Sequence, residues 1–118
     1  MGRLSTHVLD TSLGRPGAGI ELLVERIDGD SRRRVASAVT NDDGRCDAPL
    51  LEGDALIAGE YEMRFALGAY FDRTGVPAAD GRRFLDTVVI RFGIVDAGEH
   101  YHVPLLISPF AYSTYRGS

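Results

Sequence analysis

Polar and apolar residues alternate with a period of two along much of this chain. The pattern recurs in seven segments rich in β-branched or aromatic residues: 4–9, 20–25, 35–39, 60–67, 87–95, 101–107 and 111–116. A period of two places successive side chains on opposite faces of a β-strand. Turn-forming sequences such as SLGRPGAG, IDGDS and NDDGR separate several of these segments. We therefore expect each segment to form a strand.

The segment LGAYFDRTG, residues 67–75, is the one stretch that favours a short helix. Six or more short strands divided by Gly, Asp and Pro turns predict an all-β fold built as a two-sheet β-sandwich. The chain has 118 residues and shows no fixed-period repeat, low-complexity segment or linker. This length is typical of one domain, so we expect a single domain over residues 1–118.

The charge of the chain argues against nucleic acid as a partner. The formal net charge is −4, and all 13 basic residues are arginine. A mildly acidic chain offers no electrostatic attraction to phosphate backbones. Residues 32–34 form the densest basic patch, but acidic residues surround it (Asp28, Asp30, Asp42 and Asp43). We expect this patch to be a solvated loop or strand edge.

Cys46 is the only cysteine, so no disulfide can form within the chain. That composition fits a reducing compartment. No apolar stretch has the length of a secretory signal or of a membrane span. We therefore expect a cytoplasmic protein without a membrane partner. No neighbouring sequence marks Cys46 as an activated nucleophile.

Two of the predicted strands have one apolar face and one face of mixed polarity. Apolar residues suited to a core alternate, in residues 101–107, with His102, Pro104, Leu106 and the following Ser108. Near the start of the chain, Ser5, His7 and Leu9 share a similar mixed face. A face of this kind is typical of a surface covered by a ligand or by another subunit. Pro104 also indicates that its strand is irregular or lies near an edge there.

His7 and His102 lie on these mixed faces, whereas His100 precedes its strand and is expected in a loop. An imidazole titrates near neutral pH, so the pair could supply a general base and its orienting partner. A purely structural role for each histidine is the alternative. A zinc site lacks closely spaced ligands, apart from His100 and His102 themselves. The chain also has no Gly-x-Ser-x-Gly motif for a serine nucleophile.

Three segments together carry a resemblance to a known family. LSTHVLD, DDGR and the final YHVPLLISPFAYSTYRGS resemble the transthyretin-related family of 5-hydroxyisourate hydrolases over residues 4–118. The terminal Tyr-Arg-Gly-Ser separates these enzymes from the transthyretin hormone carriers. The resemblance implies a sandwich of about eight strands with one short helix, and a homotetramer whose paired dimers enclose a central channel. It also implies hydrolysis of 5-hydroxyisourate to 2-oxo-4-hydroxy-4-carboxy-5-ureidoimidazoline in urate degradation, without metal or organic cofactor.

The family's functional residues correspond to His7, Arg45, His102, Tyr115 and Ser118. One histidine would activate water and the other would orient it, while Arg45 would bind substrate and stabilise oxyanion charge. Tyr115 would bind substrate, and Ser118 would fix a histidine tautomer or a substrate nitrogen. The chain departs from the family pattern at residues 83–86 and at Cys46, where threonine is frequent. A non-catalytic small-ligand carrier or a structural sandwich is the alternative function, but neither requires this set of residues.

Overall fold

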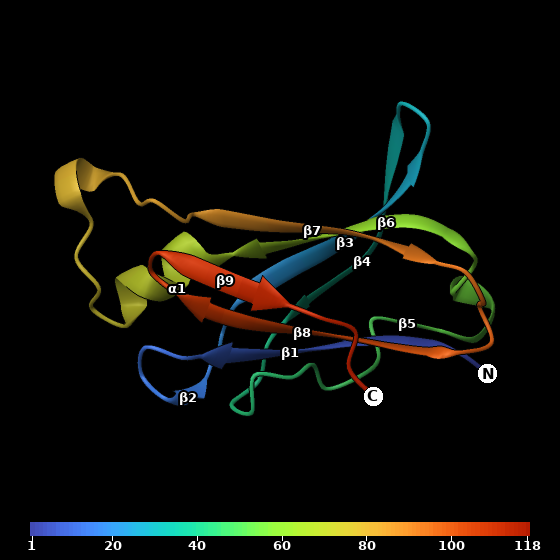
Figure 1. The fold of residues 1–118 in the computed structure, drawn as a ribbon, viewed down its shortest axis with the longest axis horizontal. Helices are drawn as coiled ribbons and strands as arrows, with labels where there is room; N and C mark the ends of the chain where they lie inside the picture. Colours follow the sequence, from blue (N-terminus) through green and yellow to red (C-terminus); the bar gives the residue numbers. More distant parts are fainter.

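Two β-sheets pack face to face in the computed structural model, which describes residues 1–118 except for the side chain of Ala79 (Figure 1). One sheet has the order β2-β1-β8-β9, with β5 also paired to β1, and the other has the order β4-β3-β6-β7. The strands are β1 (Arg3–Asp10), β2 (Arg15–Pro16), β3 (Glu21–Asp28), β4 (Ser31–Val39), β5 (Leu51–Glu52), β6 (Gly59–Ala66), β7 (Thr87–Ile94), β8 (His100–Ser108) and β9 (Ala111–Thr114). This architecture confirms the predicted two-sheet β-sandwich.

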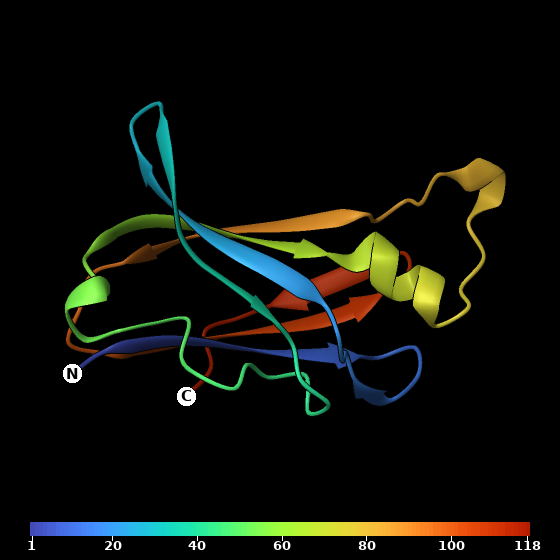
Figure 2. The same cartoon turned by 180° about the vertical axis from the view of Figure 1, so that it is seen from behind.

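The predicted helix is also present, as α1 (Leu67–Arg73), directly after β6. Figure 2 shows α1 at the end of the sandwich where β6 finishes. Two short 3-10 helices, η1 (Gly53–Ala55) and η2 (Ala79–Gly81), lie in connections. Within the described part of the chain, no helix combines the length and the apolar character needed to cross a bilayer.

Several predicted strand boundaries differ from the structure, and three of them bear on the interpretation. β4 begins at Ser31, not at residue 35, because the hairpin pairs Asp28 with Ser31 and extends the ladder through the arginines. β8 begins at His100, which pairs with Arg3 of β1, so the prediction of a loop at His100 was wrong. β9 ends at Thr114 rather than at residue 116. In each case pairing with a neighbouring strand, and not local sequence, sets the boundary.

The core lies between the two sheets and under α1. Alternate residues of β1, β6, β7 and β8 are buried in it, as the period of two predicted. Its largest fully buried side chains come from β1, β6, α1 and β8 and from the adjoining segments: Leu4, Ile20, Leu56, Tyr61, Met63, Phe65, Leu67, Phe71, Leu105 and Ile107. One contiguous apolar cluster therefore holds both sheets together.

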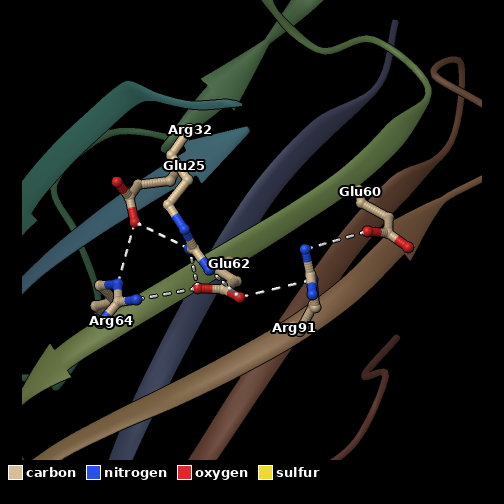
Figure 3. A network of polar contacts seen from close by, with 6 residues as sticks. All are labelled: Glu25, Arg32, Glu60, Glu62, Arg64 and Arg91. Atoms are coloured by element: carbon tan, nitrogen blue, oxygen red, sulfur yellow. Dashed lines mark hydrogen bonds and ion pairs between the residues drawn. The ribbon is translucent and has the colours of Figure 1, made fainter. Parts of the chain in front are cut away.

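A polar network covers the outer face of the second sheet (Figure 3). Glu62 is only 5% exposed although it points away from the core, because Arg32, Arg64 and Arg91 surround its carboxylate. The hydrogen bond from Arg32 lowers the pKa of Glu62. Residues 32–34 lie on β4, an edge strand of this sheet, as expected. The Arg32 side chain nevertheless lies over the sheet, where it pairs with Glu62.

Candidate functional site

His7 and His102 lie on neighbouring strands of the first sheet. β1 and β8 pair in parallel, with Ser5 opposite His102 and His7 opposite Pro104. The two histidines therefore share one face, offset by two residues along the strands. Both are half-buried, on the side opposite the buried residues Thr6 and Val8. The alternation in the sequence correctly placed each histidine on the face of its strand that points away from the core.

Arg45 reaches this face through a turn that bonds to the outer edge of β1. β5 pairs with one end of β1 and β2 with the other, which leaves the middle of the edge open. There the Val8 amide donates to the Gly44 carbonyl over 2.8 Å, and Arg45 forms an isolated antiparallel bridge with His7. The backbone of Arg45 is thus tied directly beside His7.

The turn NDDGR is shaped by Asn41 and Gly44. The Asn41 side-chain oxygen accepts the amides of Asp43 (2.9 Å) and Arg45 (3.1 Å), which closes the turn from inside. Gly44 has a φ of +76°, and a Cβ there would lie 2.3 Å from the Val8 carbonyl oxygen. Only glycine combines this conformation with so close an approach to β1.

The last four residues leave the sheet and pass beside His102. Pro104 has no amide to extend the β8–β9 ladder, and its carbonyl instead accepts the Thr114 hydroxyl over 2.7 Å. β8 lies between β1 and β9 and continues through Pro104. The irregularity predicted at Pro104 is therefore limited to the point where the pairing of β8 with β9 ends. The Gly117 amide then donates to the His102 carbonyl over 2.7 Å.

The other two predicted residues are exposed in the single chain. Tyr115 is 59% exposed and lines a hollow of about 350 Å³ together with Tyr101. Among the residues that the structure describes, no hydrogen bond joins Tyr115 to either site histidine. Ser118 directly follows Gly117 and is exposed. Their roles stay predictions.

Electrostatics couple the two histidines to Arg45. Burial lowers the pKa of His7, the Arg45 cation lowers it further, and a hydrogen bond to the Asp43 backbone opposes this in part. Burial, the Arg45 cation and His7 all lower the pKa of His102. Both imidazoles are therefore neutral at neutral pH, the form in which a histidine can accept a proton.

Ser5 is a residue of this site that the sequence interpretation did not select. Its hydroxyl lies 2.8 Å from Nδ1 of His102. The alternating pattern places Ser5 on the same face as His7, but only the β1–β8 register puts it opposite His102. Its contact with a histidine 97 residues away leaves no local signal in the sequence.

A hollow elsewhere on the surface does not include His7, Arg45 or His102. One hollow of about 630 Å³ lies on the other sheet and is lined by Leu23, Arg34 and Arg64 among others. Across the described residues, no group of three or more His, Cys, Asp or Glu side chains is arranged to hold a metal ion. The juxtaposition of His7, Arg45 and His102 thus defines the candidate site.

Comparison with known proteins identifies the family of this chain. The family model described as HIUase/Transthyretin matches residues 4–117. The chain belongs to the HIUase/Transthyretin family. A relative from Ralstonia nicotianae named 5-hydroxyisourate hydrolase is 56% identical over 118 residues, and the match covers 100% of both chains. Several further relatives of that name, down to 46% identity, also match nearly the whole chain.

Solved structures of family relatives have the same fold. An (S)-allantoin synthase superposes with a TM-score of 0.92 at 44% identity; the match covers 99% of this chain and 44% of that one. Klebsiella pneumoniae 5-hydroxyisourate hydrolase has a TM-score of 0.82 at 37% identity, with both chains covered fully. Sea bream transthyretin, solved with thyroxine, has a TM-score of 0.85 at 26% identity, and the match covers 98% and 94% of the chains. The predicted family and fold are both confirmed.

Proposed function

We propose that this protein is an enzyme that hydrolyses 5-hydroxyisourate to 2-oxo-4-hydroxy-4-carboxy-5-ureidoimidazoline, a step of urate degradation. Relatives 46–56% identical along nearly the whole chain carry the name of this hydrolase. The observation that carries the proposal is the meeting of His7, Arg45 and His102, which come from two strands and a turn far apart in sequence. A face that served only to pack another subunit would not need this combination.

The reaction requires water to attack a ring carbonyl of the substrate. One neutral histidine of the pair accepts a proton as water adds to the carbonyl carbon, and the other orients the water. The carbon–nitrogen bond of the ring then breaks and its nitrogen takes up a proton. The attacked carbon becomes the carboxyl group of the product, and the nitrogen becomes part of its ureido group.

Arg45 is suited to the charge that develops during this attack. Its guanidinium is a rigid fork of donors that matches the oxygen-rich heterocycle. A donor placed where negative charge appears lowers the barrier more than it strengthens substrate binding. The same cation helps to keep His7 and His102 neutral at neutral pH. Arg45 thus serves both the oxyanion and the base.

The assembly proposed from the family is a homotetramer, a pair of dimers around a central channel. The mixed face with His7 and His102 is only half-buried in one chain. Packing of this face against other subunits would exclude water around the substrate, and Tyr115 and Ser118 would then line the enclosed site. We propose a cytoplasmic location, as expected from the single cysteine.

Ultraviolet assays with freshly generated 5-hydroxyisourate test the proposal. His7→Ala and His102→Ala should each lower kcat/KM about a hundredfold or more, the usual contribution of general-base catalysis. His100→Ala is the matched control, because His100 is an exposed histidine of the same strand as His102. We expect the control to retain wild-type turnover.

Two outcomes would contradict the proposed function. Turnover close to wild type in both histidine variants would exclude the histidine-pair mechanism. A wild-type protein that leaves 5-hydroxyisourate at its spontaneous rate of decay, yet binds thyroxine-like aromatic ligands, would favour the carrier alternative. Circular dichroism of each variant shows that the fold is intact in these comparisons.

A further inference from the structure

The imidazole of His102 is held on two of its edges by residues outside the histidine pair. The Ser5 hydroxyl lies 2.8 Å from Nδ1. On another edge, Gly117 approaches so closely that a Cβ at this glycine would lie 2.7 Å from Cδ2 of His102 and 3.2 Å from the Pro104 ring. Real Cβ atoms essentially never lie within 3.0 Å of such a neighbour, so a side chain here would displace the ring.

We propose that Ser5 and Gly117 are positioning residues, which hold the His102 ring in one orientation and leave Nε2 as the nitrogen available to the substrate or its water. The proposal rests on the proposed hydrolase function of this site. Neither residue needs to touch the substrate to act in this way.

The geometry of the imidazole explains why the Ser5 hydrogen bond selects one ring orientation. Nδ1 and Cδ2 both flank Cγ, so a half-turn of the ring would exchange their places. That rotation would put a carbon against the Ser5 hydroxyl and lose the hydrogen bond. The hydrogen bond to Ser5 therefore favours one of the two ring orientations, and the nearby Gly117 limits the space at the other edge.

The backbone supports both contacts. Ser5 and His102 are opposite each other in the parallel ladder between β1 and β8, so the hydroxyl is delivered by a rigid sheet. Gly117 is tied to the same residue by its amide, which donates to the His102 carbonyl over 2.7 Å. The glycine is required here for space, since a methyl group would overlap the imidazole. Loss of the Ser5 hydroxyl would leave the ring free to turn, whereas a methyl group at residue 117 would push the ring aside.

Kinetics of three Ser5 and Ser37 variants test the hydroxyl. Ser5→Ala should lower kcat about five- to tenfold with little change in KM, the size of one neutral hydrogen bond. Ser5→Thr retains the hydroxyl, and threonine is favoured in β-strands. This variant should keep at least half of the wild-type kcat. Ser37→Ala is the control, because Ser37 is an exposed serine in β4 of the other sheet. Wild-type kcat in Ser5→Ala would overturn the role of Ser5.

A second pair of variants tests the tight contact. Gly117→Ala should lower kcat more than tenfold, since the methyl group displaces the catalytic ring by a sizeable fraction of an ångström. Gly93→Ala is its control, because a Cβ at Gly93 meets nothing within 4 Å. If Gly117→Ala and Gly93→Ala have the same kcat, Gly117 does not position the His102 ring.

Imidazole ¹⁵N NMR without substrate separates this inference from the proposed reaction. Ser5→Ala should shift the Nδ1 resonance of His102 and leave that of His7 in place, and Ser5→Thr should return it toward the wild-type position. These shifts would support the positioning role of Ser5 even if wild-type protein failed to open 5-hydroxyisourate. That failure would refute the proposed function alone. Identical His102 spectra in wild type and Ser5→Ala would refute the positioning role of Ser5.

Discussion

Gly44→Ala should disconnect Arg45 from the histidines without altering any proposed catalytic side chain. The added Cβ would lie 2.3 Å from the Val8 carbonyl oxygen, so the turn and β1 must separate by about 1 Å to regain ordinary contact. Such a separation breaks the 2.8 Å bond from the Val8 amide to the Gly44 carbonyl. Arg45, the next residue, moves away from His7 with the turn.

The loss of unfolding free energy in Gly44→Ala has two contributions. An alanine at a φ of +76° costs about 1–2 kcal/mol of backbone strain. Loss of the backbone hydrogen bond adds about 1 kcal/mol, which brings the total to roughly 2–3 kcal/mol of unfolding free energy. A displacement of about 1 Å at a group that stabilises the transition state lowers turnover about a hundredfold.

The chain offers a control that carries the strain without the clash. Gly29 has a φ of +60°, and a Cβ there meets nothing within 4 Å. Gly29→Ala should therefore lose about 1–2 kcal/mol of stability and keep wild-type kcat/KM. Urea unfolding and the 5-hydroxyisourate assay measure both quantities. Equal stability and equal kcat/KM in Gly44→Ala and Gly29→Ala would show that the turn does not position Arg45.

Three further predictions follow from the site and its support. Because burial and the Arg45 cation lower the pKa values of His7 and His102, kcat/KM should decline with falling pH at a midpoint below 6.5; a midpoint above 6.5 would contradict neutral histidines. Tyr70→Phe removes a 2.7 Å hydrogen bond to the buried Asp10 carboxylate and should cost about 1.5–3 kcal/mol in urea unfolding at pH 7, whereas exposed Tyr112→Phe should cost almost nothing. Hydrolysis should be insensitive to chelators, and inhibition by EDTA that zinc reverses would instead indicate a metal site.

Alternation in the sequence determined the class of fold and the faces of the strands. A strand whose every second residue is apolar can bury only one face, so segments 4–9 and 101–107 disclosed which side carries His7 and His102. The turn NDDGR was equally readable, because its residue types favour one local conformation. The family motifs then added Arg45 to the two histidines. All of these features depend on residues close together in the chain.

Tertiary structure alone decided which strands are neighbours and in what register. The parallel pairing of β1 with β8 puts Ser5 opposite His102, and a slip of one residue would have removed this contact. The start of β8 at His100 and the end of β9 at Thr114 depend on pairing partners in the same way. Hydrogen bonds between distant segments are governed by the packing of the whole sheet, and the local residue pattern carries no record of them.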